Sequence, residues 1–94
     1  MAYITIAPAF PTGRLVALPA VLEAVPQKEL LQALGRHLTC DWGELTEADR
    51  RNNEHALRYG ERLISAYQSE GGTRFWIITE ADRSATTFLL PEDY

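Results

Sequence analysis

Three short runs of β-branched and aromatic residues in the last third of the chain constrain its fold more than any other feature. They cover residues 62–67, 73–79 and 84–90. Runs of this length and composition are typical of strands. The gaps at residues 69–72 and 80–83 have the lengths and residue types of tight hairpin turns. The pattern therefore predicts a three-stranded antiparallel meander.

Two helices are predicted before this meander. From Gln27 the helical period places four leucines on one stripe: Leu30, Leu31, Leu34 and Leu38. Thr46 begins a second helix, because its hydroxyl can accept from the third backbone N–H, and Gly60 is a natural left-handed stop. The predicted inner stripe of this second helix consists of Leu45, Ala48, Asn52, Ala56 and Tyr59. We expect the buried Asn52 amide to bond a neighbouring loop backbone.

The N-terminal third carries weaker signals. Residues 3–6 alternate as a short strand does, and residues 14–18 form either a second short strand or an extended lead-in. Pro19 suits the first position of a short helix that ends at Pro26. Together the pattern predicts one α+β domain over residues 1–94, with the meander packed against two or three helices and room for short extra N-terminal strands.

The charge is unevenly distributed along the 94 residues. The first 40 hold three basic and two acidic side chains, and the rest hold six basic and eleven acidic ones. This acidic balance argues against a surface that follows nucleic-acid phosphates. The single cysteine excludes an intramolecular disulfide, and no apolar run reaches the length of a membrane span. We expect a cytoplasmic protein.

The usual catalytic and metal-binding residues form no motif. His37 and His55 show no paired-ligand spacing, so we expect no metal and no cofactor, and both histidines are interpreted as helix-edge side chains. Cys40 is a poor nucleophile, because the adjacent carboxylate of Asp41 raises its pKa.

The densest polar cluster is Glu80-Ala81-Asp82-Arg83-Ser84. The structural interpretation is a hairpin turn in which Asp82 accepts from backbone N–H groups and Arg83 pairs with Glu80 or Asp82. The functional alternative adds Arg74 and Tyr67 from neighbouring strands to make a ligand-gripping or nuclease-like patch at one edge of the sheet.

Trp76 indicates an interaction surface. It alternates with Phe75 and Ile77, so both faces of its strand are aromatic or apolar, and the predicted helices are too few to cover both. We expect one face to bind a partner protein or a second copy of the chain. The predicted partner-binding residues are Asp41, Trp42, Arg74, Trp76, Glu80, Asp82 and Arg83.

The C-terminal two thirds of the chain resemble a known family. The strongest match is Trp76-Ile77-Ile78-Thr79-Glu80-Ala81-Asp82-Arg83-Ser84-Ala85-Thr86-Thr87, followed by Leu90-Pro91-Glu92-Asp93-Tyr94. This stretch is similar to small bacterial proteins described as plasmid-related or, in places, as type I restriction enzyme methylation subunits. The resemblance covers about residues 34–94. It implies a bacterial setting on plasmids or prophages, and accessory roles toward host proteins. It implies no methylation chemistry, for which 94 residues lack the sheet and the motif.

The sequence therefore predicts a non-enzymatic protein-binding module that modulates or inhibits a larger host complex, with an anti-defence or anti-CRISPR role among the candidates. One alternative is a small toxin-like ribonuclease using Arg74, Arg83 and Tyr94. Another is a DNA-binding regulator using the arginines of the helix at residues 46–59.

Overall fold

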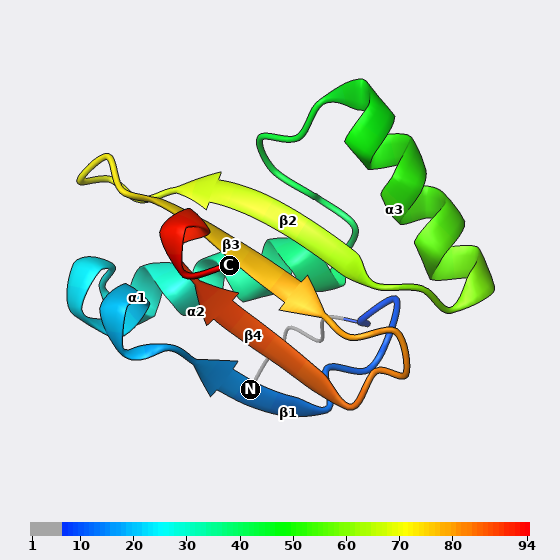
Figure 1. Ribbon diagram of the computed structural model, residues 1–94, viewed down its shortest axis with the longest axis horizontal. Helices are drawn as coiled ribbons and strands as arrows, with labels where there is room; N and C mark the ends of the chain where they lie inside the picture. Colours follow the sequence, from blue (N-terminus) through cyan, green and yellow to red (C-terminus); the bar gives the residue numbers. More distant parts are fainter. Residues whose placement is uncertain (1–6) are drawn as a thin grey trace, which may run out of the picture.

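The computed structural model describes residues 7–94, and the strand predicted at residues 3–6 lies outside this range. A four-stranded sheet carries two helices on one face, and a third helix stands beside one edge (Figure 1). The elements in chain order are β1 (Arg14–Ala17), α1 (Pro19–Ala24), α2 (Gln27–Leu38), α3 (Glu47–Tyr59), β2 (Leu63–Gln68), β3 (Arg74–Thr79), β4 (Ala85–Leu89) and the 3₁₀ turn η1 (Pro91–Asp93). Within the described range, no helix has the length and apolar character needed to cross a bilayer.

The α+β class is confirmed, but the sheet is larger than the predicted meander. β2, β3 and β4 pair antiparallel as expected, and β1 adds a fourth strand parallel to β4, giving the order β1-β4-β3-β2. The sheet is thus four-stranded and mixed, where the sequence predicted three antiparallel strands. The extra pairing joins Arg14 to Ala85 and Ala17 to Phe88, about 70 residues apart in the chain, which no local pattern encodes.

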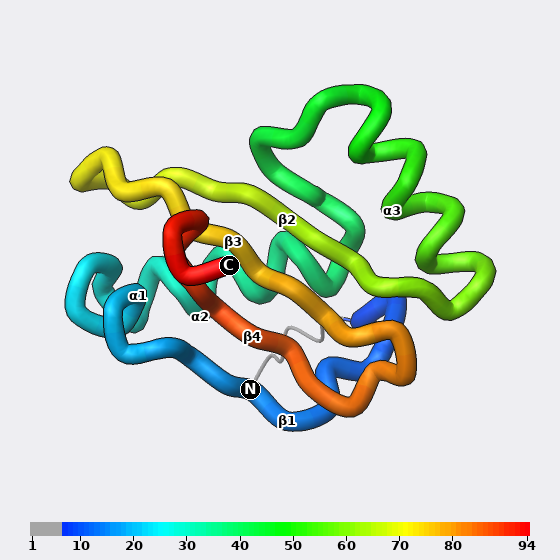
Figure 2. The backbone as a smooth tube through the Cα atoms, viewed as in Figure 1, coloured from blue at the N-terminus to red at the C-terminus, as the bar shows by residue number. Residues whose placement is uncertain are grey.

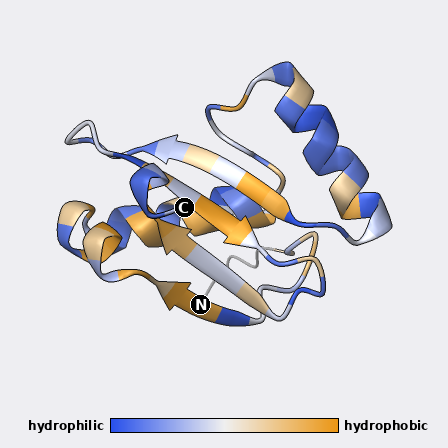
Figure 3. Cartoon of the chain, in the orientation of Figure 1, coloured by the Kyte–Doolittle hydropathy of each residue, from blue (hydrophilic) through white to orange (hydrophobic). Residues whose placement is uncertain are grey.

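Helices α1 and α2 cover one face of the sheet and close the main core there. Nine buried residues form this cluster: Val21, Val25, Leu30, Ala33, Leu34, Tyr67, Phe75, Ile77 and Phe88. Figure 3 shows apolar residues concentrated on the sheet and on these two helices, whereas α3 is largely hydrophilic. The predicted leucine stripe of α2 is wrong at Leu31, which is 53% exposed. His37 takes a buried position on the helix instead.

Helix α3 has the predicted ends and a different buried face. Thr46 accepts from the backbone N–H of Asp49, and Gly60 adopts φ +71°, as predicted. The buried residues of α3 are Asn53 and Ala56, whereas Asn52 and Tyr59 are exposed. The predicted amide-to-backbone bond therefore exists one residue further along the chain.

That bond closes the outer edge of β2. The Asn53 side chain donates to the carbonyl of Ile64 (2.6 Å) and accepts from its N–H (3.1 Å), so one amide acts as a strand neighbour. Beyond it, the N–H of Ala66 donates to Trp42 and its carbonyl accepts from Glu44. Figure 2 shows the segment between α2 and α3 running beside β2. Gly43 is required there, because its φ is +75° and a Cβ would collide with the Ala66 carbonyl.

Candidate functional site

The face of the sheet opposite α1 and α2 is the candidate functional site. We call this face the open face. The pairing register places six side chains at its centre, of which Ala66, Ile78 and Leu89 are buried and Ile64, Trp76 and Thr87 are partly buried, and it places Val16, Gln68 and Arg74 around them. Of the described elements, only η1 and the C-terminal residue lie over it (Figure 1). A sheet normally buries both faces or exposes a polar one, so an apolar open face indicates an interaction surface.

Trp76 occupies the centre of the open face. It stands directly opposite Ala66 on β2 and Leu89 on β4, both of which are buried. The ring of Tyr94 packs edge-on against Trp76, with ring centroids 5.4 Å apart. Tyr94 is 68% exposed and Trp76 is partly buried, so most of the aromatic surface that this pair presents to solvent belongs to Tyr94.

Two half-exposed ion pairs flank these aromatic rings. At one end Arg62 contacts Glu80 at 3.3 Å and donates to the Tyr94 hydroxyl at 2.7 Å. At the other end Arg74 lies 3.7 Å from Glu44. The open face therefore has an apolar centre and a rim of paired charges, the arrangement found in protein–protein interfaces.

The structure brings three of the seven predicted partner-binding residues onto this face: Arg74, Trp76 and Glu80. Sequence reasoning did not assign Arg62, Glu44 or Tyr94 to it. The hairpin register is the signal that indicates Arg62, because it pairs Leu63 with Thr79 and so sets Arg62 opposite Glu80. Glu44 lies in a loop, and its position follows from no local pattern.

Asp41 and Trp42 lie elsewhere. Trp42 is only 2% exposed and packs in a second apolar cluster with Phe10, Ala56 and Leu63. Its indole N–H donates to Glu54 at 3.2 Å. With so little surface, Trp42 stabilises the fold and offers a partner almost nothing to contact.

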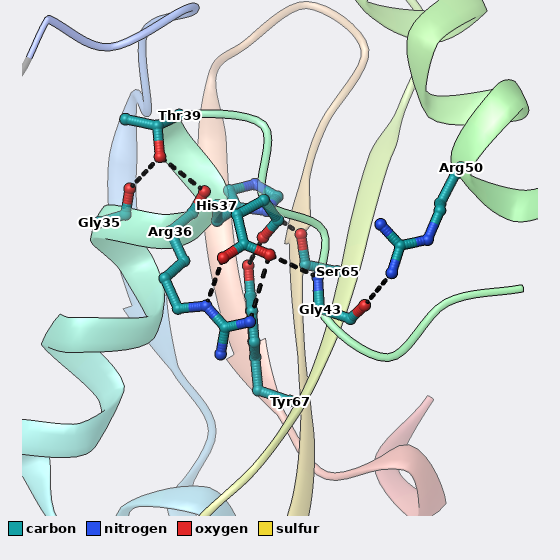
Figure 4. A network of polar contacts seen from close by, with 9 residues as sticks. Gly35, Arg36, His37, Thr39, Gly43, Arg50, Ser65 and Tyr67 are labelled. Carbon is teal, nitrogen blue, oxygen red and sulfur yellow. Dashed lines mark hydrogen bonds and ion pairs between the residues drawn. The ribbon is translucent and has the colours of Figure 1, made fainter. Parts of the chain in front are cut away.

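Asp41 instead anchors the loop after α2 through Arg36, Gly43 and Tyr67, and Figure 4 shows these three residues gathered beside the loop. Its carboxylate accepts from Arg36 at 2.7 Å, which lowers its pKa, and its carbonyl accepts from the Tyr67 hydroxyl at 2.6 Å. Burial raises the pKa of Tyr67 to about 12, so this hydroxyl stays protonated and keeps donating.

Asp82 and Arg83 form the predicted turn between β3 and β4. Asp82 accepts from the Ser84 N–H at 3.0 Å, as expected, and hydrogen bonds from Ser84 lower its pKa. The predicted pairing of Arg83 with a carboxylate is wrong. Its guanidinium donates to three backbone carbonyls, those of Glu80 (3.0 Å), Ala56 (3.1 Å) and Glu61 (2.5 Å). Arg83 therefore holds the end of α3 against the turn.

His37 is fully buried, and its interpretation as a helix-edge side chain is wrong. Its Nδ1 lies 2.5 Å from Ser65 Oγ and its Nε2 lies 2.9 Å from Thr79 Oγ1 (Figure 4 shows the Ser65 contact). The series of hydrogen bonds continues from the Thr79 hydroxyl to the Thr86 hydroxyl (2.8 Å) and ends at the carbonyl of Thr12, 2.8 Å from the Thr86 hydroxyl. We call these five residues the His37 network.

The protons of the His37 network have one consistent direction. Each hydroxyl has a single proton, and Thr86 gives its own to the Thr12 carbonyl. Thr79 must then donate to Thr86 and accept from His37 Nε2–H. Burial, followed by the charge of Arg83, lowers the pKa of His37 to about 4, so the ring is neutral at pH 7 and its Nδ1 accepts from Ser65.

The close Ser65–His37 pair has the composition of a nucleophile and its base, but not the access. His37, Ser65 and Thr79 each have 0% of their surface exposed. No substrate reaches the Ser65 hydroxyl in this arrangement, and the network satisfies buried polar groups instead.

Cys40 is equally unsuited to nucleophilic chemistry. Burial and the nearby charge of Glu54, rather than Asp41, raise its pKa, so the thiolate is scarce at neutral pH. Within residues 7–94, no group of three metal-ligating side chains comes together.

The arginines required by the two alternative functions, a ribonuclease and a DNA-binding regulator, do not come together in the structure. Arg74 begins β3 and Arg83 follows its other end, so the two cations are about 20 Å apart along the strand. In α3, Arg50 donates to the carbonyl of Gly43 and Arg51 pairs with Glu47. Neither set forms a cluster of free cations facing one point.

Comparison with known proteins gives no relative. No family model matches the chain, and neither the search of curated proteins nor that of solved structures found a match. The family resemblance of residues 34–94 is therefore untested by these comparisons.

Proposed function

We propose that this chain is a non-enzymatic protein-binding module whose partner docks on the open face around Trp76. The observation that carries the proposal is a sheet face with an aromatic centre, Trp76 and Tyr94, over which only η1 and the C-terminal residue lie among the described elements. Exposed aromatic side chains surrounded by a polar rim are the usual anchors of protein interfaces.

The charges support a protein partner over a nucleic acid. The two arginines on the rim, Arg62 and Arg74, are already paired with Glu80 and Glu44, and the chain carries a net charge of -4. A phosphate backbone needs free clustered cations. A protein surface with its own apolar centre and mixed charges complements the open face better.

The family resemblance supports the biological setting of the proposal. We place the protein in the bacterial cytoplasm, encoded on a plasmid or prophage, with a larger host complex as the partner. Inhibition of a host defence, including an anti-CRISPR function, fits a small acidic module that binds without catalysis.

Partner capture followed by binary binding tests the proposal. The immobilised protein is used to isolate a partner from bacterial lysate, and the purified pair is then titrated by calorimetry. Trp76→Ala and Tyr94→Ala should each weaken binding by roughly tenfold or more, because central aromatic residues carry most of an interface's affinity.

Tyr59→Ala is the matched control. Tyr59 is 62% exposed on α3 and Tyr94 is 68% exposed on the open face, so the two substitutions remove the same group from surfaces of similar exposure. Thermal melting of each variant separates lost binding from lost folding. Undiminished binding by a folded Trp76→Ala protein would place the partner on another surface and overturn the proposal.

A further inference from the structure

Arg62 connects three parts of the open face through one side chain. It immediately precedes β2, and its guanidinium uses two different nitrogens. Nη2 lies 3.3 Å from the carboxylate of Glu80, just after β3, and Nη1 donates to the Tyr94 hydroxyl at 2.7 Å. The guanidinium also lies 6.0 Å from the centroid of the Tyr94 ring, at the limit of a cation–π contact. Arginine can bind two partners in fixed directions in this way, whereas the ammonium group of lysine has only one nitrogen.

The backbone around Tyr94 contributes little to the position of its ring. Two backbone hydrogen bonds close η1, from Asp93 to the Leu90 carbonyl (2.9 Å) and from Tyr94 to the Pro91 carbonyl (3.2 Å). A single 3₁₀ turn is weakly stable, because its hydrogen bonds have poor geometry and each ordered residue loses conformational entropy. The Tyr94 side chain therefore needs tertiary contacts to keep one position.

We propose that Arg62 is a positioning residue that holds Tyr94 against Trp76 before a partner binds. The proposal rests on the proposed function, in which these two rings are the anchors of docking. A mobile Tyr94 would lose rotamer freedom on binding, which lowers affinity, and Arg62 removes that loss in advance. Glu80 holds the guanidinium itself in place, and we call the contacts among Glu80, Arg62 and Tyr94 the Arg62 clamp.

Arg74 shows what distinguishes Arg62 from an ordinary arginine on the rim. The two side chains are similarly exposed, 49% for Arg62 and 57% for Arg74, and each pairs with one glutamate. Only Arg62 also bonds an aromatic anchor of the open face. Since half-exposed ion pairs contribute little to stability, we expect loss of Arg62 to change the order of Tyr94 and to leave the fold intact.

NMR on the protein alone tests the Arg62 clamp. In the wild type, the amides of residues 92–94 should have order parameters of about 0.85, and NOEs should join the rings of Trp76 and Tyr94. Arg62→Gln should lower these order parameters below about 0.6 and remove the NOEs. Arg74→Gln is the matched control and should change neither, because Arg74 pairs with Glu44.

Two conservative variants separate the geometry of the clamp from its charge. Arg62→Lys keeps the positive charge but has one nitrogen for two partners, so it should not restore the order of residues 92–94. Tyr94→Phe keeps the ring and removes the hydroxyl that Arg62 binds, so it should loosen residues 92–94 as Arg62→Gln does.

Calorimetry with the partner captured on the wild-type protein tests the effect on docking. Arg62→Gln should raise the dissociation constant about three- to tenfold, because Tyr94 must then be ordered on binding. In a Tyr94→Ala background the same substitution should have almost no further effect, because Arg62 acts through Tyr94.

Three results would overturn the proposal. Residues 92–94 that are equally ordered in the wild type and in Arg62→Gln would mean that Arg62 does not hold Tyr94, and order restored by Arg62→Lys would mean that charge alone suffices. Losses of affinity that multiply in the double variant would mean that Arg62 contacts the partner itself. The NMR result needs no partner, so it stands apart from the Trp76→Ala binding test on which the proposed function depends.

Discussion

His37 makes the stability of the fold depend on pH. Its pKa falls from 6.5 to about 4 on folding, so the unfolded chain binds more protons between these values. The stabilisation from the neutral histidine is complete above pH 6.5 and is lost as the pH falls toward 4. At 1.36 kcal/mol per pKa unit, the free energy of unfolding should drop by about 3 kcal/mol over this window. Urea denaturation at a series of pH values from 7 to 4 measures the drop.

Comparing variants of the two histidines shows which of them causes the pH dependence of stability. His37→Gln should abolish most of the pH dependence between 6.5 and 4, at the cost of a less stable protein. His55→Gln should retain it, because the side chain of His55 is exposed and pairs only with Glu61. A wild-type stability that stays constant down to pH 4 would show that His37 is not held neutral in the core.

Residues with local partners were predictable, and those with distant partners were not. The cap at Thr46, the left-handed Gly60 and the Asp82 turn bond within a few residues, and the structure confirms all three. His37 reads as polar in any hydropathy pattern. It is buried only because β2 and β3, far along the chain, place Ser65 and Thr79 against both ring nitrogens.

At the scale of elements, one buried amide, that of Asn53, joins α3 to the edge of the sheet by hydrogen bonds. Asn53→Ala removes both bonds to Ile64 and leaves a backbone N–H and carbonyl without partners near the core. At about 1–3 kcal/mol for an unsatisfied buried group, we expect a loss of about 3 kcal/mol in the free energy of unfolding. Chemical denaturation monitored by circular dichroism measures it.

The neighbouring asparagine is the control. Asn52 is exposed on the same helix, so Asn52→Ala should change stability by less than about 0.5 kcal/mol. Equal losses for the two variants would contradict the assignment of the edge-closing role to Asn53.

The elements themselves show how far local patterns reach. The three strands of the meander were predicted because residues 62–90 contain three runs rich in β-branched and aromatic residues, separated by short turn sequences. The fourth strand was left open between strand and lead-in. Its pairing with β4 joins residues about 70 positions apart, so it depends on the folded arrangement of the chain and not on any local sequence pattern. On α3 the predicted inner position Ala56 is buried, but the buried amide is Asn53 rather than Asn52, about 100° further around the helix.

At the scale of the whole molecule, the sheet with α1 and α2 forms one packed body, and α3 is an addition to its edge (Figure 1). Only Asn53 and Ala56 of α3 are buried. Helix α3 adds Ala56 and Leu57 to the second apolar cluster. Polar contacts also hold it: the Asn53 amide, Arg50 to the Gly43 carbonyl, and Arg83 to carbonyls at the end of the helix. Elements with few buried apolar contacts open at lower free energy than the core.

Hydrogen exchange should therefore rank the elements, with the central strand β3 most protected and α3 least protected among the longer helices and strands. Arg83→Ala should lower the protection of α3 amides by about 2 kcal/mol, since charged donors to backbone carbonyls are lost, and should leave β3 nearly unchanged. Arg74→Ala is the control, because it breaks only a half-exposed ion pair with Glu44 and should alter neither element. Equal loss of protection in α3 and β3 on Arg83→Ala would mean that the helix and the sheet unfold as one unit.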